Sequence, residues 1–306
     1  MSPTQATVLG GTGFLGSTIV QALLSRGWRV RIGARHPERA RIAADTGPVT
    51  GMRCDVRDEA SLVRAMQGSA AVVNAVGLYR ESGGERFDSV HVQGAARAAH
   101  SAARAGIERF VHVSGIGASR ASASSYVRAR AEGECAVREV FPTAMVVRPS
   151  VLFGPGDGFL GAIDALSKRS PVFPLFGRGD TRMQPVYVGD VAAAVASLLD
   201  DPAVHPCIVE LGGKRVLTYR RIVEAVLGFR GRRRLLLPVP FGVWMLQAKL
   251  LAPLQNAPPS EHQVILMRSD NVVGDGMAGL ADLGIAPGDL EALLPTALGA
   301  GAATAC

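Results

Sequence analysis

Gly10-Gly11-Thr12-Gly13-Phe14-Leu15-Gly16 lies between a short apolar run, Ala6–Leu9, and an amphipathic run, Ser17–Arg26. This order predicts a strand, a glycine turn and the start of a helix. Because glycine lacks a Cβ atom, it permits a tight turn, close approach of a pyrophosphate and close packing of the helix on the strand. The first N–H groups of the helix then face an anion. A tight turn without a ligand has the same composition, but the flanking strand and helix are the context that a dinucleotide site requires.

The composition is that of a folded, basic protein. The chain has 306 residues, 48% of them hydrophobic, with a net charge of +7 and a pI near 9.7. These values support a large core and suit an anionic ligand, an acidic protein or an anionic membrane surface. We expect no nucleic-acid partner, because no recognition motif accompanies the basic residues.

The cysteines and the first residues indicate the compartment. Four widely spaced cysteines form no CxxC pair, so we expect neither a metal site nor a disulfide framework, and a reducing environment fits best. Residues 1–5 lack the basic start of a signal peptide. We therefore predict a cytoplasmic protein.

Strands and helices alternate through the first 150 residues. Apolar runs predict five strands after the first helix, and amphipathic stretches predict helices between them. The strands are expected at 30–34, 50–54, 71–75, 109–113 and 143–147, and the helices at 58–67, at 87–104 and after Ser122 or Ser124. This alternation predicts an α/β fold: a Rossmann-type doubly wound parallel sheet, covered by helices on both faces.

The alternation ends near Gly154, where prolines begin to interrupt shorter elements. We therefore expect an NAD(P)-binding domain at 1–154, joined by a return segment at about 184–212. A smaller C-terminal cap would comprise 155–183 and 213–298. The small residues of 299–306 predict a flexible tail.

The end of the second predicted strand indicates which dinucleotide to expect. An acidic residue at this place binds the ribose 2′-hydroxyl of NAD, whereas an Arg can hold the 2′-phosphate of NADP. The chain has Arg35 here and no carboxylate before Glu38. A charge-assisted bond from guanidinium to phosphate contributes about 1.5–3 kcal/mol, which favours NADP(H) over NAD(H). A solvated basic loop is the alternative.

Two further cofactor contacts are expected where strands end. Asp55, after the third strand, is placed to meet the adenine amino group. Asn74-Ala75-Val76-Gly77 forms a small turn at the carboxyl end of the fourth strand, where ligands of open α/β sheets lie.

These motifs occur in the order found in the short-chain dehydrogenase/reductase superfamily. The chain resembles its extended and atypical branches, which include nucleotide-sugar epimerases, over nearly its whole length. The resemblance is carried by the glycine turn, Asp55-Val56, Asn74–Gly77, Tyr126–Glu134, Arg148-Pro149-Ser150 with Phe153-Gly154, and Val186–Val191. Three segments are most similar to bacterial relatives of the NADPH-binding accessory subunit of respiratory complex I: Val111–Ser114, Gln184–Val191 and Asp270–Val273.

The resemblance implies a catalytic constellation from which this chain departs. Active members carry a Lys four residues after a Tyr, and the motif here is Tyr126-Val127-Arg128-Ala129-Arg130. Arg130 keeps the positive charge on a larger planar group, and that charge is expected to lower the pKa of Tyr126. The family's polarising Ser or Thr matches Gly115, with Ser114 one residue early, and its relay Asn matches His91, for which a packing role is the alternative.

Two functions follow from this resemblance. The first is an NADP(H)-binding protein with a departed catalytic centre, which holds its nucleotide as a structural or sensing cofactor and docks on a respiratory complex or another protein. The second is an active NADPH-dependent reductase, or a nucleotide-sugar epimerase or dehydratase. Its catalytic residues would be Tyr126, Arg130 and Ser114. The residues expected to bind the cofactor in either case are Gly10, Thr12, Gly13, Phe14, Leu15, Gly16, Arg35, Asp55, Val56, Asn74, Ala75, Val76, Gly77, Tyr126, Arg130, Pro149 and Ser150.

A basic and apolar segment spans residues 230–254. Arg230-Gly231-Arg232-Arg233-Arg234 precedes a leucine run and a mostly apolar stretch. Positive charge beside apolar bulk predicts a surface that meets anionic lipid or a membrane complex, which would place the protein at the inner face of a membrane. The alternative is a cap helix over a substrate, with the arginines solvated or holding a substrate phosphate. Prolines interrupt the run, which is shorter than the roughly 20 residues that a spanning helix needs.

Overall fold

The computed structural model describes residues 4–40, 47–200, 207–251 and 259–299, which form two compact units. The first unit comprises the described residues within 1–149, 188–211 and 275–286. The second comprises those within 150–187, 212–274 and 287–306.

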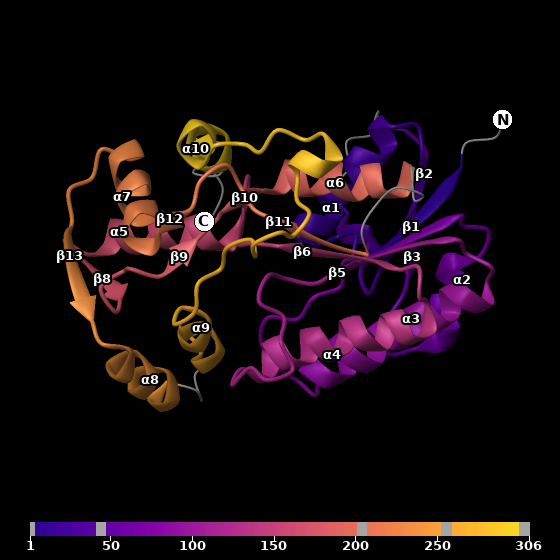
Figure 1. The fold of residues 1–306 in the computed structure, drawn as a ribbon, viewed down its shortest axis with the longest axis horizontal. Helices are drawn as coiled ribbons and strands as arrows, with labels where there is room; N and C mark the ends of the chain where they lie inside the picture. Colours follow the sequence, from indigo (N-terminus) through magenta and orange to yellow (C-terminus); the bar gives the residue numbers. More distant parts are fainter. Residues whose placement is uncertain (1–3, 41–46, 201–206, 252–258, 300–306) are drawn as a thin grey trace. The chain divides into compact units, whose positions relative to one another are not determined.

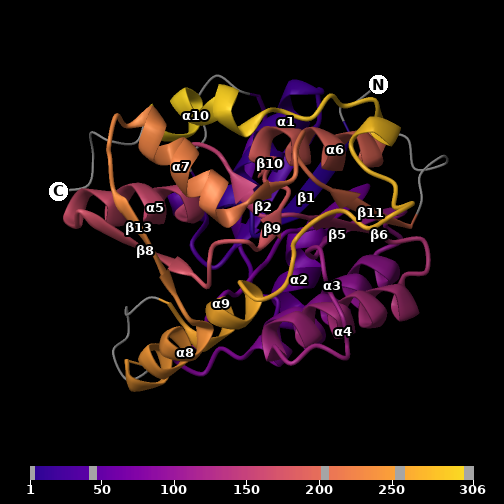
Figure 2. The same cartoon turned by 60° about the vertical axis from the view of Figure 1, so that its left-hand side comes forward.

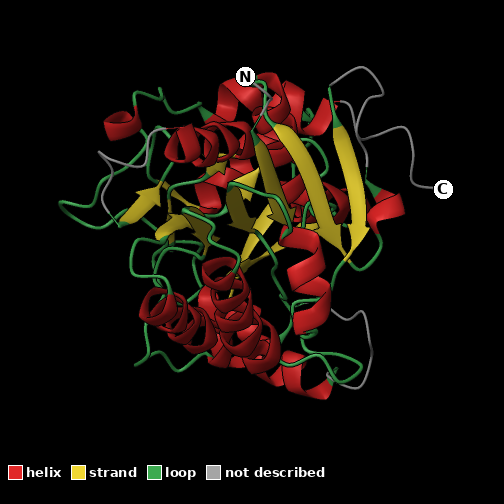
Figure 3. Ribbon diagram, turned by 90° about the vertical axis from the view of Figure 1, so that its right-hand side faces the viewer, coloured by secondary structure: helices red, strands yellow, loops and turns green. Residues whose placement is uncertain are grey.

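The first unit is built on a seven-stranded parallel sheet in the order β11-β6-β5-β4-β1-β2-β3. Figure 3 draws the strands of the chain in yellow and the helices in red. Its strands are β1 Gln5–Leu9, β2 Arg29–Ala34, β3 Val49–Arg53, β4 Ala71–Asn74, β5 Arg109–Val113, β6 Met145–Pro149 and β11 Ile208–Leu211. β1 pairs with β2 on one side and with β4 on the other. The chain therefore winds outward in both directions from β1, which makes the gap between β1 and β4 the topological switch point where open α/β sheets bind ligands.

Helices cover both faces of this sheet (Figure 1). On one face, α1 Phe14–Ser25 packs against α6 Val188–Asp200. On the other face lie α2 Glu59–Met66, α3 Gln93–Arg104 and α4 Ser125–Val140. α3 packs against α4. A Cβ atom at Gly133 of α4 would lie 2.0 Å from the carbonyl oxygen of His91, two residues before α3, so α4 lies directly against the backbone there. The predicted Rossmann-type α/β fold is confirmed.

Three elements of the first unit differ from the prediction. The return segment adds an edge strand, β11, which was too short to recognise beside the prolines before it. β6 starts at Met145 and continues to Pro149, two residues beyond the predicted end. The predicted helix 87–104 is a five-residue π-helix, η2 Asp88–Val92, followed by α3. Apolar periodicity does not distinguish these two helix types, because the π-helix adds only one residue to a turn.

The second unit consists of short strands and helices around a core of its own. Its elements are β7 Leu152–Phe153, α5 Gly158–Arg169, β8 Val172–Phe176, β9 Arg182–Met183, β10 Val186–Tyr187, β12 Leu217–Thr218, α7 Tyr219–Phe229, β13 Leu235–Val239, α8 Phe241–Leu250, α9 Glu261–Leu266 and α10 Leu290–Gly299. The strands pair as β10-β7, β12-β9 and β13-β8. α5, α7 and α10 pack together around Leu160, Ile222 and Leu294 (Figure 2).

The division into units differs in detail from the predicted domains. Residues 275–286, which we assigned to the cap, belong to the first unit, where the N–H of Glu210 donates to the carbonyl oxygen of Ala278 at 2.8 Å. Residues 150–154 and 184–187 belong to the second unit instead of the first. Gly299 is the last residue of α10, and the rest of the predicted tail lies outside the described residues.

Candidate functional site

The glycine turn follows β1 at the switch point, and backbone atoms surround it closely. Gly10 has a φ of +77°, and a Cβ atom there would lie 2.9 Å from the carbonyl oxygen of Ala75, in the turn after β4. A Cβ atom at Gly16 would lie 2.1 Å from the carbonyl oxygen of Gly10. Only glycine fits at either position, so the start of α1 lies directly against the end of β1.

The first turn of α1 is formed by predicted cofactor residues. The helix begins at Phe14, three residues before the predicted start, and Leu15 and Gly16 follow in the same turn. Gly13 is the N-cap and has no side chain to accept from the first N–H groups, while Thr12 lies half-buried just ahead of it. A helix start of this kind presents free donors and a partial positive charge, the arrangement that holds a pyrophosphate.

A buried polar pair, Asn74 and His112, fixes the turn after β4. Asn74 accepts a hydrogen bond from the N–H of Val76 at 3.3 Å, and its amide nitrogen lies 3.2 Å from Nδ1 of His112. Burial, followed by the charge of Arg130, lowers the pKa of His112 to about 3, so its ring is neutral and can accept from Asn74. A Cβ atom at Gly77 would lie 3.8 Å from Nη2 of Arg130. The turn thus connects the glycine turn with Arg130.

Four charged side chains meet near the ends of β2 and β3. Arg35 follows β2, and its guanidinium pairs with the carboxylate of Glu85. Asp55 follows β3 and accepts from Nε and Nη2 of Arg57 at 3.0 and 2.7 Å. The hydrogen bonds from Arg57 hold the pKa of Asp55 below its usual value. Both predicted adenosine contacts therefore already have a protein partner, and Glu85 could not be foreseen because it is 50 residues from Arg35.

Val56 has a packing contact beside this cluster. Its side chain is buried, and a Cβ atom at Gly94 of α3 would lie 2.8 Å from its Cγ2. The segment after β3 is therefore held against α3.

Tyr126 occupies the first turn of α4, which Ser124 caps by accepting from the N–H of Val127. The Tyr126 ring lies 5.5 Å from the ring of Phe87 and 5.6 Å from that of His91, measured between centroids. Arg130 lies one turn later, with Cζ 5.0 Å from the centroid of the Tyr126 ring.

The pKa of Tyr126 moves against our expectation. Burial raises it to about 12, although the charge of Arg130 acts in the opposite direction, as predicted. Burial destabilises the phenolate form of Tyr126 by more free energy than its attraction to Arg130 provides. Tyr126 therefore carries its proton at neutral pH.

Two polar side chains at this end have buried atoms without a hydrogen-bond partner among the described residues: Oγ of Ser114, and Nε and Nη1 of Arg130. Ser114 follows β5, and a Cβ atom at the next residue, Gly115, would lie 3.5 Å from Nη1 of Arg130. Leaving such donors without an acceptor costs about 1–3 kcal/mol each, and more for a charged group. A polar ligand at the carboxyl end of β5 would satisfy them, and the ribose and nicotinamide of a dinucleotide have the required acceptors.

The sequence of the first unit matches a known family. The model of the NAD dependent epimerase/dehydratase family covers residues 6–212. The chain belongs to this family. A nicotinamide dinucleotide is the cofactor of the family, and the glycine turn and the unpaired Arg130 donors fit such a molecule.

Relatives of the chain within the family include respiratory-complex subunits. It is 35% identical over 299 residues to the mitochondrial subunit 9 of the NADH dehydrogenase (ubiquinone) 1 alpha subcomplex of Mus musculus, which covers 95% of this chain and 78% of that protein. It is 34% identical over 239 residues to a ceramide reductase of Caulobacter vibrioides, covering 76% and 73%. The predicted superfamily and the likeness to complex I accessory subunits are confirmed.

Solved structures share the fold. A triphenylmethane reductase from Citrobacter superposes with a TM-score of 0.75 at 19% identity, over 96% of this chain and 99% of that one. An NADPH-dependent quinone oxidoreductase from Escherichia coli, complexed with NADPH, gives 0.74 at 18% identity, over 94% and 97%.

His91, which the resemblance matches to a relay Asn, contacts backbone atoms. Its Nε2 lies 2.9 Å from the carbonyl oxygen and 3.2 Å from the nitrogen of Leu78, in the loop after β4. Burial, followed by the charge of Arg130, lowers the pKa of His91 to about 4. His91 is therefore a neutral ring that holds the loop after β4.

A buried ion network that sequence reasoning missed holds α4 in place. Arg148 of β6 donates from Nε and Nη2 to both carboxylate oxygens of Glu134 on α4, at 2.9 and 2.6 Å. Its Nη1 donates to Glu210 of β11 at 3.2 Å. Both carboxylates are buried. The available signal was an Arg inside an apolar strand, which must find a buried partner.

The last residue of β6 and the residue after it belong to different units. The carbonyl oxygen of Pro149 accepts from the N–H of Ile116 at 3.1 Å, which joins the ends of β5 and β6. Ser150 belongs to the second unit, where its hydroxyl donates to Oδ1 of Asn271 at 2.6 Å. Asn271 belongs to the motif Asp270–Val273, whose contacts with Ser150 and with Gln184 are internal to the second unit.

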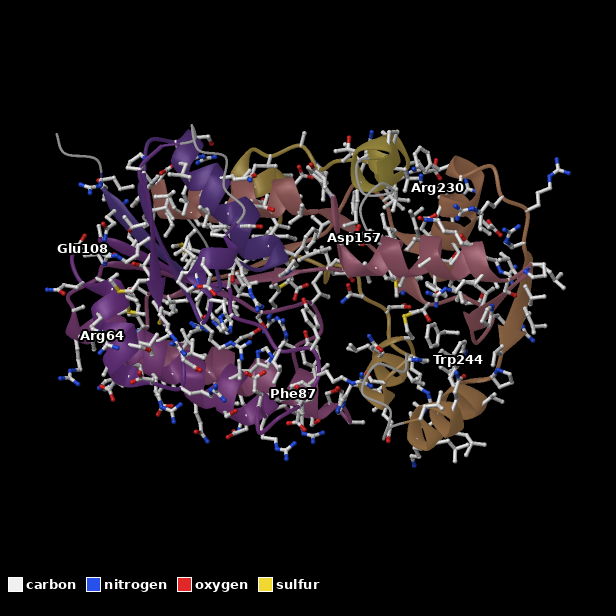
Figure 4. All side chains as sticks on the ribbon, turned by 180° about the vertical axis from the view of Figure 1, so that it is seen from behind. Arg64, Phe87, Glu108, Asp157, Arg230 and Trp244 are labelled. Atoms are coloured by element: carbon white, nitrogen blue, oxygen red, sulfur yellow. The ribbon has the colours of Figure 1, made fainter. Side chains whose placement is uncertain are left out.

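Three of the four arginines of the basic segment make hydrogen bonds within the second unit. Figure 4 labels the first of them, Arg230, at the end of α7. Arg230 donates from Nε to Asp164 of α5 at 3.0 Å, and Arg232 donates from Nη1 to the same carboxylate at 2.7 Å. Arg234 donates to the carbonyl oxygen of Ser167 at 2.8 Å. These three arginines therefore do not form the free basic surface that we expected from the sequence. Arg233 is exposed.

Proposed function

We propose that this chain binds NADP(H) as a structural or sensing cofactor and serves in a membrane-associated respiratory assembly. The main support for this proposal is a difference between the glycine turn and the positions near Tyr126. Backbone contacts at Gly10 and Gly16 leave room for nothing but glycine. The three positions that the resemblance matches to catalytic residues hold His91, Gly115 and Arg130 instead of Asn, Ser or Thr, and Lys. The likeness to complex I accessory subunits supports the assembly.

The tyrosine end supports binding better than turnover. Tyr126 is protonated, enclosed by Phe87 and His91, and covered by the guanidinium of Arg130. Gly115 offers no hydroxyl to polarise a carbonyl. Arg130 keeps the charge and donors to hold the nicotinamide ribose, so the nucleotide would be gripped without an efficient proton donor beside it.

Arg35 supports NADP(H) as the nucleotide. It follows β2, where the family's choice between a ribose hydroxyl and a 2′-phosphate is made, and its side chain is 58% exposed. A phosphate can accept two parallel hydrogen bonds from one guanidinium.

The second unit supports attachment to an anionic membrane surface. Leu235 and Leu237 of β13 and Val243, Leu246 and Leu250 of α8 are 47–70% exposed. Exposed Arg233 and Lys249 belong to the same segment. No helix in the described part of the chain could span a membrane. Apolar side chains with cations beside them suit shallow insertion among acidic headgroups. The inner, cytoplasmic face is the proposed location.

Nucleotide analysis and binding titrations test the proposal. The purified protein is denatured, released nucleotide is identified by mass, and affinities for NADPH and NADH are measured for wild type and Arg35→Asp. We expect retained NADP(H) and a fall of about tenfold or more in the NADPH/NADH affinity ratio of the variant. Arg29→Asp, at the opposite end of β2, is the matched control and should leave the ratio unchanged. Equal affinities in wild type would contradict the proposal.

Flotation with phosphatidylglycerol-rich vesicles tests the membrane surface. Wild type should float with the vesicles and dissociate as salt rises, whereas Leu246→Glu/Leu250→Glu should stay with the soluble fraction. The control Val63→Glu alters an exposed apolar residue of α2 and should float normally. Equal flotation of both variants would show that this surface is not the contact.

A further inference from the structure

The loop between β4 and η2 places the carboxylate of Glu85 against Arg35. Its tip is a four-residue turn in which the N–H of Glu85 donates to the carbonyl oxygen of Ser82 at 2.8 Å. Both central residues have positive φ, +53° at Gly83 and +86° at Gly84. Glycine adopts this conformation without strain, and the resulting turn reverses the chain tightly. Glu85 is thereby held at a fixed place on the returning segment, against the Arg35 guanidinium.

The base of the same loop is anchored separately. His91 holds the backbone of Leu78, and Oε1 of Glu81 accepts from the N–H of Phe87 at 2.8 Å. These bonds tie Leu78 and Glu81 to η2 and to the residue that precedes it, and the Glu85–Arg35 pair holds the tip between Ser82 and Glu85. Breaking that pair would therefore free the tip without detaching the loop.

Charge balance shows what a phosphate would encounter here. Asp55 and Arg57 satisfy each other, so the partner of Arg35 is Glu85, whose carboxylate is 19% exposed. A 2′-phosphate bound to Arg35 would bring nearly two negative charges beside that carboxylate. Like charges a few ångströms apart repel strongly where water is partly excluded. A carboxylate and a phosphate therefore compete for one guanidinium.

We propose that Glu85 is the residue that sets nucleotide preference at this site, by occupying Arg35 in place of the 2′-phosphate and releasing the tip of its loop when NADP(H) displaces it. This deepens the function proposed above, on which it rests. NAD(H) has a hydroxyl in place of the phosphate, so the Glu85–Arg35 pair persists when it binds. The conformation of the loop then reports which dinucleotide is bound.

The loop also reaches the other end of the site. Tyr79, next to the anchored Leu78, has its ring 5.9 Å from that of Tyr126 and is 68% exposed. Phe87, at the other base of the loop, packs on Tyr126 as well. The loop that carries Glu85 therefore also carries an exposed aromatic ring beside Tyr126.

Binding titrations of Glu85→Gln test the preference. Removing the competing charge should raise the NADPH/NADH affinity ratio by about fivefold. Asp88→Asn, an exposed carboxylate three residues later with the same change of charge, should leave the ratio unchanged. In an Arg35→Gln background, Glu85→Gln should have a much smaller effect, because without the guanidinium neither the carboxylate nor the phosphate is held at this place. An unchanged ratio in the single variant, or an equal effect in both backgrounds, would overturn the proposal.

Hydrogen exchange of the wild-type complexes tests the loop. Amides of residues 79–86 should exchange several-fold faster with NADPH than with NADH bound, while the glycine turn is protected in both complexes. Equal exchange of 79–86 in the two complexes would overturn the released tip. A wild type that binds neither dinucleotide would instead refute the proposed function, so the two failures are distinguishable.

Discussion

At the glycine turn, the backbone of α1 lies directly against the backbone that follows β1. A Cβ atom at Gly16 would lie only 2.1 Å from the carbonyl oxygen of Gly10. At the Tyr126 end the geometry depends on side chains instead: an arginine over a phenol, a histidine on a loop and an ion network under α4. A backbone contact tolerates no substitution, because any side chain collides with it. Side-chain contacts can be replaced one at a time. This difference explains how the nucleotide end can keep its form while the catalytic end departs from the family.

Gly16→Ala should lower nucleotide affinity and stability more than any other substitution proposed here. A small effect would show that the backbone contacts at the glycine turn are no stricter than the side-chain contacts near Tyr126. Its methyl group would overlap a backbone oxygen, so α1 must move away from β1. We expect a loss of more than about 100-fold in NADPH affinity and destabilisation of at least about 3 kcal/mol. Calorimetric titration and urea unfolding measure both. The control is Gly161→Ala on α5, where a Cβ has open space, and a gain of about 0.5–1 kcal/mol is expected.

Glu134→Gln tests whether side chains support the other end. It removes one of the two charges that neutralise buried Arg148. We expect destabilisation of about 3 kcal/mol in urea unfolding. Glu132→Gln, two residues earlier on the same helix, should cost less than about 0.5 kcal/mol. Equal effects of the two substitutions would show that the ion network does not support α4.

Acid should weaken the histidine contacts of this end. The folded-state pKa of His91 is about 4, below the ordinary value near 6.5, so between these values the unfolded chain binds more protons than the folded chain. Stability is therefore complete above about pH 6.5 and falls as pH falls. From pH 7 to pH 5, His91 should account for about 2 kcal/mol of lost stability.

The variant His91→Asn, which introduces the residue type that the resemblance implies here, should remove that part of the pH dependence. His100→Asn alters an exposed histidine of α3 and should leave the dependence unchanged. Urea unfolding at several pH values between 5 and 7 provides the measurement. Parallel pH profiles for wild type and His91→Asn would refute the buried neutral ring.

Arg130→Ala and Tyr126→Phe should have the smallest effects, and they compare two neighbouring side chains of α4 for their contribution to NADPH affinity. Loss of the two unpaired Arg130 donors should lower NADPH affinity by about tenfold. Tyr126→Phe keeps the ring among Phe87 and His91, so its affinity should stay within about twofold of wild type. A larger loss for Tyr126→Phe than for Arg130→Ala would reverse the roles assigned to the two residues.

Local signals in the sequence were enough to predict the sheet and the glycine turn. Strand alternation, the Asp58 N-cap of α2 and the spacing Gly10–Gly16 each depend on neighbours in the chain. The Glu85–Arg35 pair and the Arg148 network join residues far apart in sequence, so no local pattern indicates them. The π-helix likewise escapes apolar periodicity. The sign of the Tyr126 pKa shift depended on its burial, which neighbouring residues alone do not determine.

The most direct test of the central claim follows NADPH on the intact protein. Protein loaded with one equivalent of NADPH is mixed with quinones, aldehydes, ketones and sugar nucleotides, and the absorbance of the reduced nicotinamide is recorded over hours. A structural or sensing nucleotide predicts that NADPH stays bound and reduced throughout. Oxidation by any of these compounds that is lost in Tyr126→Phe, while NADPH affinity is kept, would contradict the claim and establish an enzyme.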